Sequence, residues 1–478
     1  RAALWLGWCF GWAHLTLANN WIATAFTHQA KMPEALGWVA VPLVGIYLAI
    51  YPALAALAAH LLARRAPLPA FALVLAGAWV LAEWARGTFF TGYPWPPLGL
   101  MLLGGWKAQG LAAVLPWMGT YALSGLAVLL GAGIAVSAMR RRVTDMVVPL
   151  AAMAFFMHVP VMPEQGENNL RYTLVQPLLK QSEINDASKF EEQFVRLADL
   201  TMPGRVGSRI VLWPESAIPD YLEDGYPERY YFQTTAGADP EFARRRIGAV
   251  IGPQSTLLAG VVNLDIAARK DGSLGAVSAR NSVIALNGEG EIRHHYAKAH
   301  LVPFGEYLPL RTILEPLGLS RLVAGSIDYA PGPGPRTLDL GEHGKAGIQI
   351  CYEIVFSGAV VDADNRPDYI FNPSNDGWFG TWGPPQHLAQ ARMRALEEGL
   401  PVLRSTTTGI SAVIDANGIV RGAIGRGKAD TLEGLVPNAL PPTLFARAGH
   451  WLTLGWAALF LLLGLGMPRL LALIHRRG

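Results

Sequence analysis

Long uncharged stretches flank a polar middle section in this chain, and their spacing is the first guide to its fold. Six mostly apolar runs approach the roughly 20 residues that a helix needs to cross a bilayer: residues 3–20, 38–63, 68–87, 111–138, 145–160 and 450–474. One such run is equally typical of a buried core helix, but six runs around a polar section favour membrane helices. We therefore expect about five transmembrane helices within 1–160, a polar domain over 161–449, and a last transmembrane helix with a short tail over 450–478.

Within 161–449 the pattern changes to short apolar runs that alternate with helical stretches. Strands are predicted at "YTLVQP", "RIVLWPES", "GAVIGP", "LLAGVVNL", "SVIALNGEGEI", "AGIQICYE", "YIFNPSND" and "SAVIDANGIV". The Asn-Gly pairs in "ALNGEG" and "IDANGI" each predict a hairpin. Helical periodicity is present in "DASKFEEQFVRLADL" and "QHLAQARMRALEEGL". This mixture predicts an α/β domain in which helices cover the faces of the sheets.

Composition and charge support a membrane protein and suggest its orientation. Hydrophobic residues make up 51% of the chain and charged residues only 16%, and the net charge of +3 is not gathered on the polar domain, so we expect no nucleic-acid partner. Arginines cluster at Arg64–Arg65, Arg140–Arg142 and Arg476–Arg477. If the N-terminus is cytoplasmic, six crossings put all three clusters on the cytoplasmic side, as the positive-inside bias requires. Residues 161–449 then lie outside the cytoplasm. Because the chain begins at Arg1 and enters an apolar run at once, we expect an incomplete N-terminus.

Three segments of the polar domain place a reactive side chain where an apolar strand gives way to a turn. They carry Glu215, the pair Lys298 and Glu306, and Cys351. An isolated cysteine is more often a buried packing residue than a nucleophile. A disulfide has no partner within the domain, since the other cysteine, Cys9, lies in the first apolar run.

Together these side chains have the chemistry of a nucleophilic site. Glu215 can take the thiol proton of Cys351, and Lys298 can stabilise an oxyanion together with the backbone N–H of Tyr352. Three histidines are alternative bases: His294, His295 and His300. The sequence contains neither the Cys/His spacing of a zinc site nor a phosphate-binding glycine loop, so we expect no metal and no cofactor.

Several motifs carry a resemblance to a known family. "WPESAIP", "KAHLVPFGEYLP", "CYEIVF" and "SNDGWFG" resemble the signature of the nitrilase, or carbon–nitrogen hydrolase, superfamily. With "ANNWIATAF", "EWARGTFFTGYPWPPLG" and "QARMRALEEGLPVLRSTTTGISAVID", the chain resembles the membrane branch of that superfamily, the apolipoprotein N-acyltransferases. Two departures stand out. The family usually has about eight crossings, whereas this chain has six apolar runs and begins near what would be the third crossing. In addition, "RSTTTGIS" has threonines where one or two asparagines are expected.

The resemblance implies a polytopic helical membrane domain joined to a nitrilase-like α-β-β-α sandwich. It implies a catalytic triad of Glu215, Lys298 and Cys351, with Glu306 as a further essential acid. Residues near the family's active site are matched by Tyr352, Glu353, Asn281 and Trp378, and for these four a structural role is as plausible as direct chemistry.

The implied reaction is a two-step acyl transfer. An acyl chain passes from a phospholipid to Cys351 as a thioester, and then to the α-amino group of a diacylglyceryl-cysteine in an apolipoprotein. The implied location is the bacterial inner membrane, with the catalytic domain facing the periplasm, and we expect a monomer. Two alternatives remain: a membrane-tethered amidase that uses water as acceptor, and a scaffold or receptor without chemistry.

Overall fold

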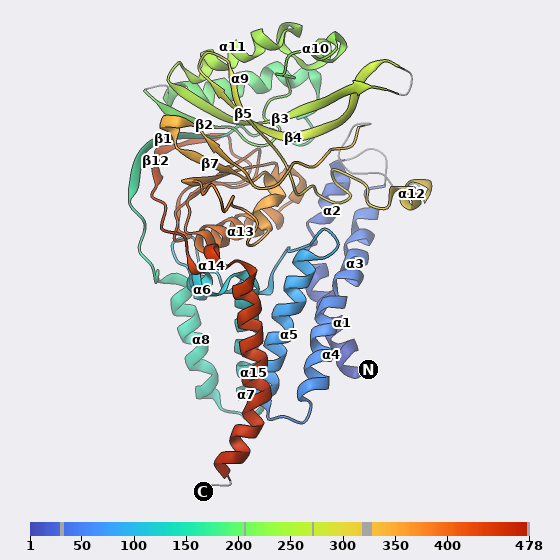
Figure 1. The fold of residues 1–478 in the computed structure, drawn as a ribbon, viewed down its shortest axis with the longest axis vertical. Helices are drawn as coiled ribbons and strands as arrows, with labels where there is room; N and C mark the ends of the chain where they lie inside the picture. The colour runs from blue at the N-terminus through green and yellow to red at the C-terminus, as the bar shows by residue number, and fades with distance from the viewer. Residues whose placement is uncertain (29–32, 205–206, 270–271, 318–326, 476–478) are drawn as a thin grey trace.

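In the computed structural model, a bundle of apolar helices stands beneath a domain of two stacked β-sheets (Figure 1). The structure describes residues 1–28, 33–204, 207–269, 272–317 and 327–475. The arginine cluster at 476–477 lies outside these ranges. Both termini lie at the helical part of the molecule, away from the sheets (Figure 1).

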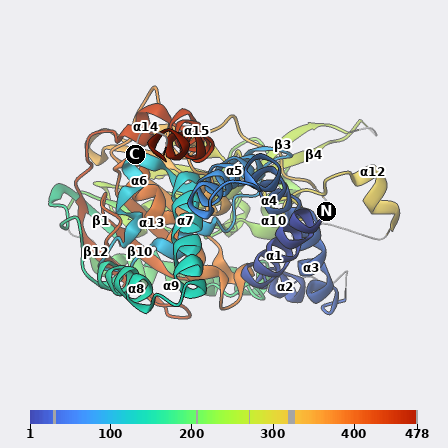
Figure 2. The same ribbon diagram turned by 90° about the horizontal axis from the view of Figure 1, so that it is seen from below.

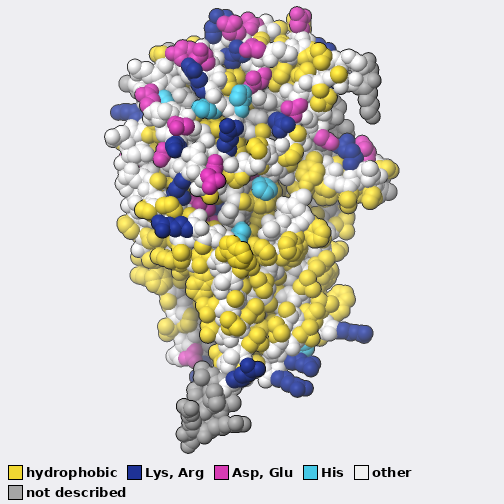
Figure 3. All heavy atoms as spheres, viewed as in Figure 1, with side chains coloured by type: hydrophobic (Ala, Val, Ile, Leu, Met, Phe, Trp, Pro, Cys, Tyr) yellow, Lys and Arg dark blue, Asp and Glu magenta, His cyan; other side chains and the backbone are white. Residues whose placement is uncertain are grey.

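The helical part contains six long segments. They are α1 (Ala2–Ala18), the consecutive helices α3 (Leu36–Leu48) and α4 (Ile50–Ala63), α5 (Leu68–Thr88), α7 (Thr120–Met139), α8 (Val143–His158) and α15 (His450–His475). Among the described residues, four spans are long and apolar enough to cross a membrane: 36–63, 68–88, 120–139 and 450–469. Helix α8 is apolar but shorter. On the face that Figure 3 shows, apolar side chains cover most of this part, which agrees with a membrane protein.

Helices α5, α7 and α15 pack against one another, as the view from below shows (Figure 2). Their contact contains Val80 of α5, Tyr121 of α7 and Phe460 of α15. The apolar run at 111–138 is not one continuous helix, because Gly119 interrupts it with a φ of 75°. A Cβ at Gly119 would lie 2.2 Å from the ring of Phe445, so a larger residue would not fit there.

The first sheet has the strand order β12-β1-β2-β3-β4-β5. Its strands are β1 (Glu167–Gln176), β2 (Arg209–Leu212), β3 (Ser255–Ala268), β4 (Leu274–Asn287), β5 (Ile292–Ala297) and β12 (Asp430–Pro437). Strands β1, β2 and β3 run parallel, and the other pairs are antiparallel. The hairpin predicted at "ALNGEG" joins β4 to β5.

The second sheet has the order β11-β10-β9-β8-β7-β6. Its strands are β6 (Thr337–Asp339), β7 (Lys345–Ile348), β8 (Tyr369–Ser374), β9 (Val402–Thr406), β10 (Ser411–Ile414) and β11 (Val420–Ile424). Here β7, β8 and β9 are the parallel strands. The hairpin predicted at "IDANGI" joins β10 to β11. The two sheets thus repeat one plan, a parallel centre with antiparallel edges.

Two helical layers complete a four-layer α-β-β-α sandwich. The first sheet is covered on its outer face by α9 (Phe190–Thr201) and α11 (Pro240–Ile251), and α13 (Gly383–Glu398) packs below the second sheet (Figure 1). Strand β2 is buried on both faces. Ile210 and Leu212 join the core between the sheets, whereas Val211 joins the core beneath α9 and α11. This arrangement confirms the expected combination of membrane helices and a nitrilase-like sandwich.

The strand predicted at "GAVIGP" is wrong, because residues 248–251 form the last turn of α11. The Asp239 side chain accepts hydrogen bonds from the backbone N–H groups of Glu241 and Phe242, and Pro240 occupies the first turn. These are strong signals for a helix start, and they lie nine residues before the apolar run. Gly252, with a φ of 93°, then ends the helix.

Buried polar groups of α13 attach the sandwich to the membrane helices. The Arg392 guanidinium donates to the carbonyl oxygens of Gly418, Gly104, Gly105 and Ala108 at 2.8–2.9 Å. Glu397 accepts hydrogen bonds from the backbone N–H and the hydroxyl of Thr120, at 2.6 and 2.7 Å. Since Thr120 is the first residue of α7, the negative charge of Glu397 is placed at the helix N-terminus, where the helix dipole is positive. The sandwich is therefore held in a fixed position on the bundle.

Candidate active site

Cys351 lies in a tight turn directly after β7. It begins the short helical turn η9 (Cys351–Val355) and is 5% exposed. Its φ is 51°, a value that residues other than glycine rarely adopt. The nucleophile predicted from the sequence thus sits on a strained turn at the end of a buried strand, with its backbone held in one orientation.

Glu215 follows β2 in the opposite sheet and faces the same region. Its Oε1 accepts a hydrogen bond from Asn281 Nδ2 at 2.7 Å, and its Oε2 accepts one from the backbone N–H of Asn375 at 2.7 Å. The backbone at Glu215 packs directly on Gly260 of β3, where a Cβ would lie 2.6 Å from the Glu215 Cα. Glycine is needed at 260 because no side chain fits between the two segments.

Lys298 and Glu306 complete a compact charged cluster with Glu215. The Lys298 Nζ lies 3.0 Å from Glu306 Oε1 and 3.6 Å from Glu215 Oε1, and all three side chains are buried. Asn281 Nδ2 bridges the two carboxylates, since it donates to Glu306 Oε1 at 2.9 Å as well as to Glu215 Oε1. The other Glu306 oxygen accepts from the backbone N–H of Val302 at 2.8 Å. Asn281 and Glu306 therefore hold both Lys298 and Glu215 in place.

The electrostatics of the cluster keep Lys298 charged and Cys351 protonated at rest. Burial opposes the charge of Lys298, but Glu306 and Glu215 more than offset it and raise the pKa of the lysine. Burial and the Glu215 carboxylate raise the pKa of the Cys351 thiol, while Lys298 acts to lower it. A thiol in this setting needs a base to take its proton during the reaction. The charges of Glu215 and Lys298 thus shift the pKa of the Cys351 thiol in opposite directions.

Glu353 connects the segment of Lys298 to the turn of Cys351. Its Oε1 accepts hydrogen bonds from the Tyr296 hydroxyl at 2.8 Å and from the backbone N–H groups of Ala299 and His300. Its Oε2 accepts from the backbone N–H of Ile350 at 2.8 Å. Burial raises the pKa of Glu353 to about 7. Because its carboxylate accepts from these four donors, Glu353 holds the segment of Lys298 and the turn of Cys351 in a fixed relative orientation.

Tyr352 and Trp378 lie at the border of the site. Tyr352 is buried, and its ring packs edge-on against Phe356 with centroids 5.1 Å apart. Trp378 is half-buried, and its ring meets His28 with centroids 5.8 Å apart.

The histidines proposed as alternative bases have other surroundings. His300 stacks on Phe356 at 4.2 Å. His295, on β5, pairs with Glu223 at 3.3 Å and is half-exposed. Neighbouring His294 lies on the same strand, whose partner is β4. The Glu215 carboxylate raises the pKa of the Cys351 thiol, which favours Glu215 over these three residues as the base.

Sequence reasoning missed a buried network beside Cys351. Ser374, at the end of β8, has its Oγ 3.3 Å from Cys351 Sγ. Asp376 lies 2.8 Å from Ser374 Oγ, pairs with Arg404 at 2.7 Å, and contacts His387 Nδ1 at 3.1 Å. The other ring nitrogen of His387 lies 3.0 Å from the Cys351 carbonyl oxygen. "SNDGWFG" pointed to this region, but no local pattern indicates His387 or Arg404.

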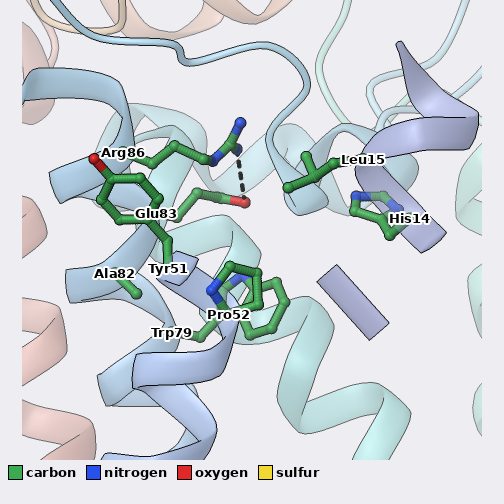
Figure 4. A pocket seen from close by; sticks show the side chains of 8 residues that line it. All are labelled: His14, Leu15, Tyr51, Pro52, Trp79, Ala82, Glu83 and Arg86. Atoms are coloured by element: carbon green, nitrogen blue, oxygen red, sulfur yellow. Dashed lines mark hydrogen bonds and ion pairs between the residues drawn. The ribbon is translucent and has the colours of Figure 1, made fainter. Parts of the chain in front are cut away.

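A separate hollow lies among the membrane helices α1, α4 and α5 (Figure 4). Its wall includes Tyr51, Trp79, Glu83 and Arg86. The Arg86 guanidinium also donates to the carbonyl oxygens of Tyr93, Trp95 and Pro96, and Glu83 accepts from the backbone N–H of Leu98. This pair fixes the loop that leaves α5. Gly92 of that loop lies against Phe356, so the loop supports the turn of Cys351.

Within the described residues, no group of three or more histidine, cysteine, aspartate or glutamate side chains has the arrangement of a metal site. The charged cluster and the thiol supply a base, a cation and a nucleophile. These are the groups that an acyl transfer through a cysteine requires.

Comparison with known proteins agrees with this architecture. The carbon–nitrogen hydrolase family matches residues 174–439, which include Glu215, Lys298 and Cys351. Among solved structures, an amidase of the nitrilase superfamily from Nesterenkonia AN1 overlaps 58% of this chain and 94% of its own, with a TM-score of 0.38 and 17% identity. By its family match, its two sheets and its site, the protein belongs to the carbon–nitrogen hydrolase, or nitrilase, superfamily.

The membrane part narrows the assignment. Residues 1–133 match the N-terminal domain of apolipoprotein N-acyltransferases. The apolipoprotein N-acyltransferase of Rhodopseudomonas palustris is 34% identical over 470 residues, 94% of this chain and 83% of that protein. The one from Bradyrhizobium diazoefficiens is 36% identical over 404 residues, 79% of this chain and 70% of that protein. The chain belongs to the apolipoprotein N-acyltransferase family.

Proposed function

We propose that this membrane acyltransferase N-acylates lipoproteins, and that Glu215, Lys298 and Cys351 carry out both steps of the transfer. Family membership supports the reaction class. The observation that carries the assignment of residues is the buried cluster in which Lys298 lies between Glu306 and Glu215, with Cys351 within its electrostatic reach.

A phospholipid is the acyl donor in this proposal. The turn of Cys351 rests on the loop that leaves membrane helix α5, through the contact of Phe356 with Gly92. This contact supports a position of the sulfur at the side of the catalytic domain that faces the bundle, where the ester groups of a bilayer lipid would lie. Burial of the site would keep water from the intermediate.

In the first step, Glu215 takes the proton of Cys351 and the sulfur attacks the acyl ester carbonyl. Lys298 and the backbone N–H of Tyr352 stabilise the negative charge that develops on the carbonyl oxygen. The bond between the acyl carbon and the glycerol oxygen breaks. Glu215 returns its proton to that oxygen, a lysophospholipid leaves, and the acyl chain remains on Cys351 as a thioester.

In the second step, the α-amino group of a diacylglyceryl-cysteine attacks the thioester. Glu215 takes a proton from the nitrogen, the C–S bond breaks, and the sulfur recovers a proton as the thiol of Cys351. The product is an amide, which is more stable than the thioester, so the transfer is favourable. The intermediate divides one difficult exchange into two easier ones.

The arginine distribution supports an orientation with the catalytic domain outside the cytoplasm. Arg64–Arg65 connect α4 to α5, and Arg140–Arg142 connect α7 to α8. Both connections lie at the end of the bundle opposite the sandwich (Figure 1). By the positive-inside bias that end is cytoplasmic. In this orientation, the catalytic domain of a protein in the bacterial inner membrane would face the periplasm. We also propose that the protein acts as a monomer.

The test is to follow the acyl group by mass spectrometry. The purified protein with Cys9→Ala, which leaves Cys351 as its one cysteine, is incubated with a phospholipid of defined acyl chains. We expect one acyl group on the Cys351 peptide, and its transfer to a synthetic diacylglyceryl-cysteine peptide on addition of the latter. Cys351→Ser should not form the thioester.

Two results would argue against the proposal. An unlabelled Cys351 peptide, despite transfer to the acceptor, would rule out the thioester. Rapid release of free fatty acid in the absence of an acceptor, without N-acyl product in its presence, would support the amidase-like alternative that uses water.

A further inference from the structure

The hydroxyl of Ser374 lies between the thiol of Cys351 and a carboxylate. Ser374 Oγ is 3.3 Å from Cys351 Sγ and 2.8 Å from Asp376 Oδ1, and all three side chains are buried. A serine hydroxyl has one proton, so it can donate to only one of these two neighbours at a time. The choice between them depends on which neighbour is able to accept.

Asp376 is held as an acceptor. Burial opposes its ionisation, but Arg404 and His387 more than offset burial and hold the pKa of Asp376 below its usual range. An ionised carboxylate accepts hydrogen bonds and cannot donate them. While Cys351 is a thiol, the Ser374 proton therefore points to Asp376, and the S–H of Cys351 points to the free lone pair of Ser374 Oγ.

The partners of Asp376 are fixed by their own contacts. Arg404 lies 2.7 Å from both carboxylate oxygens and 3.0 Å from His387 Nδ1. His387 Nε2 lies 3.0 Å from the carbonyl oxygen of Cys351, and its Nδ1 lies 3.1 Å from Asp376 Oδ1. The network thus holds the Cys351 backbone and keeps a countercharge on Asp376 when Ser374 turns away.

We propose that the Ser374 hydroxyl is a two-position switch that accepts from the Cys351 thiol at rest and donates to the sulfur when it becomes a thiolate. When Glu215 takes the thiol proton, the sulfur gains an electron pair and the Ser374 O–H rotates from Asp376 to the sulfur. Asp376 keeps its two contacts with Arg404. The same donation stabilises the sulfur when it leaves the thioester in the second step.

This inference rests on the proposed role of Cys351 as the nucleophile. It adds a hydrogen bond to the sulfur, beside the Lys298 cation, which is the member of the charged cluster that acts to lower the pKa of the thiol. A hydrogen bond to a charged atom is about twice as strong as one between neutral groups, so the switch favours the thiolate over the thiol.

The experiment measures thiolate formation directly, without lipid. In a Cys9→Ala background, Cys351 is alkylated with iodoacetamide at several pH values, all below the pKa of the thiol. Ser374→Ala should lower the second-order rate constant about 10-fold at each pH, which corresponds to a rise of about one unit in the thiol pKa. The matched control is Ser405→Ala, because Ser405 is also buried and donates to the Val175 carbonyl; its rate should equal that of the parent.

The sign of the change separates the switch from a packing role. Loosening of the turn would expose the buried thiol and raise the alkylation rate. An unchanged or a faster rate in Ser374→Ala would overturn the proposal. Since no acyl transfer is involved, a protein that fails to form a thioester would still report on the switch.

A second measurement needs no variant at Ser374. In the Cys9→Ala protein, the infrared S–H stretching band belongs to Cys351 alone. We expect this band at the lower frequency of a thiol that donates to oxygen. A band at the frequency of an unbonded thiol would contradict the resting position of the switch.

Discussion

The backbone adopts the left-handed region at Cys351 and at the neighbour of Glu215. Cys351 has a φ of 51°, and Ser216, directly after Glu215, has a φ of 55°. Each such residue costs roughly 1–2 kcal/mol unless its surroundings compensate. For Cys351 the surroundings include Glu353, which accepts from the N–H of Ile350, and His387, which contacts the Cys351 carbonyl. The site is thus rigid because hydrogen bonds on both sides of the turn hold it.

The close approach of Gly260 to Glu215 gives a prediction at this scale. In Gly260→Ala, the new Cβ would lie 2.6 Å from both the Glu215 Cα and the Ser216 nitrogen, so one of the two strands must move. Since a displacement of about 1 Å at a catalytic group can cost about 100-fold in rate, we expect acyl transfer to fall by that order. The measurement is the initial rate of N-acylation of a diacylglyceryl peptide.

The control for this variant is Gly131→Ala in α7, where nothing lies within 4 Å of the new Cβ. It should transfer acyl groups at the parental rate. Equal rates for Gly260→Ala and Gly131→Ala would show that the position of Glu215 does not limit the reaction.

The residues of the candidate site differ in how far the sequence could indicate them. Glu215, Lys298 and Cys351 each follow a strand within a short recognisable motif, and the structure places Lys298 3.6 Å from Glu215. His387 and Arg404 have no such context. His387 is a single histidine in an amphipathic helix, and only the packing of α13 against β9, β10 and η9 brings it to the Cys351 carbonyl.

At the scale of elements, α13 has two faces with separate tasks. His387 points to the site, whereas Arg392 and Glu397 bind backbone groups of the membrane part. The sequence predicted this helix and the two Asn-Gly hairpins because their signals are local. It failed at α11, where a short apolar run with β-branched residues is ambiguous and the capping signal of Asp239 lies far upstream.

Arg392→Lys should weaken the attachment of the sandwich to the bundle. Arg392 makes four hydrogen bonds from a planar fork to carbonyl oxygens, and one ammonium group cannot reach all of them. At about 1 kcal/mol or more for each buried carbonyl left without a donor, we expect a loss of about 2–4 kcal/mol. Thermal unfolding in detergent should show a lower Tm.

A matched variant for this comparison is Arg245→Lys. Arg245 is exposed on α11 and pairs with Glu241 at the surface. Its Tm should stay at the parental value, because an exposed pair contributes little. A parental Tm for Arg392→Lys as well would mean that the attachment depends on apolar packing alone.

At the scale of the whole molecule, one core extends across both parts. Trp95, from the loop after α5, is fully buried against the sandwich and donates from Nε1 to Gln386 at 2.8 Å. Its ring lies 5.0 Å from His387 and 4.8 Å from Trp21. The membrane helices are therefore part of the surroundings of the site, beyond their role as an anchor.

Trp95→Ala should affect stability and activity together. Removal of a buried tryptophan costs about 3–5 kcal/mol, and here the cavity would open beside His387. We expect a lower Tm and a slower acyl transfer from the folded fraction. Trp451→Ala, which removes a side chain that is 82% exposed, serves as the comparison. Because this side chain lies outside the core, the variant should keep the parental Tm and the parental rate of acyl transfer. Full activity of folded Trp95→Ala would show that the membrane part does not influence the site.

The pairing of β1 with β12 determines when the enzyme can become active during its synthesis. Residues 167–176 pair with residues 430–437, so the first sheet cannot be completed until residues 430–437 have left the ribosome. Such distant pairing makes folding slow relative to local helix formation. Glu215 and Lys298 follow strands of this sheet, whereas Cys351 follows a strand of the other. A growing chain therefore carries an ordinary, separate cysteine, and its thiol meets the base and the cation only when the two sheets close on each other.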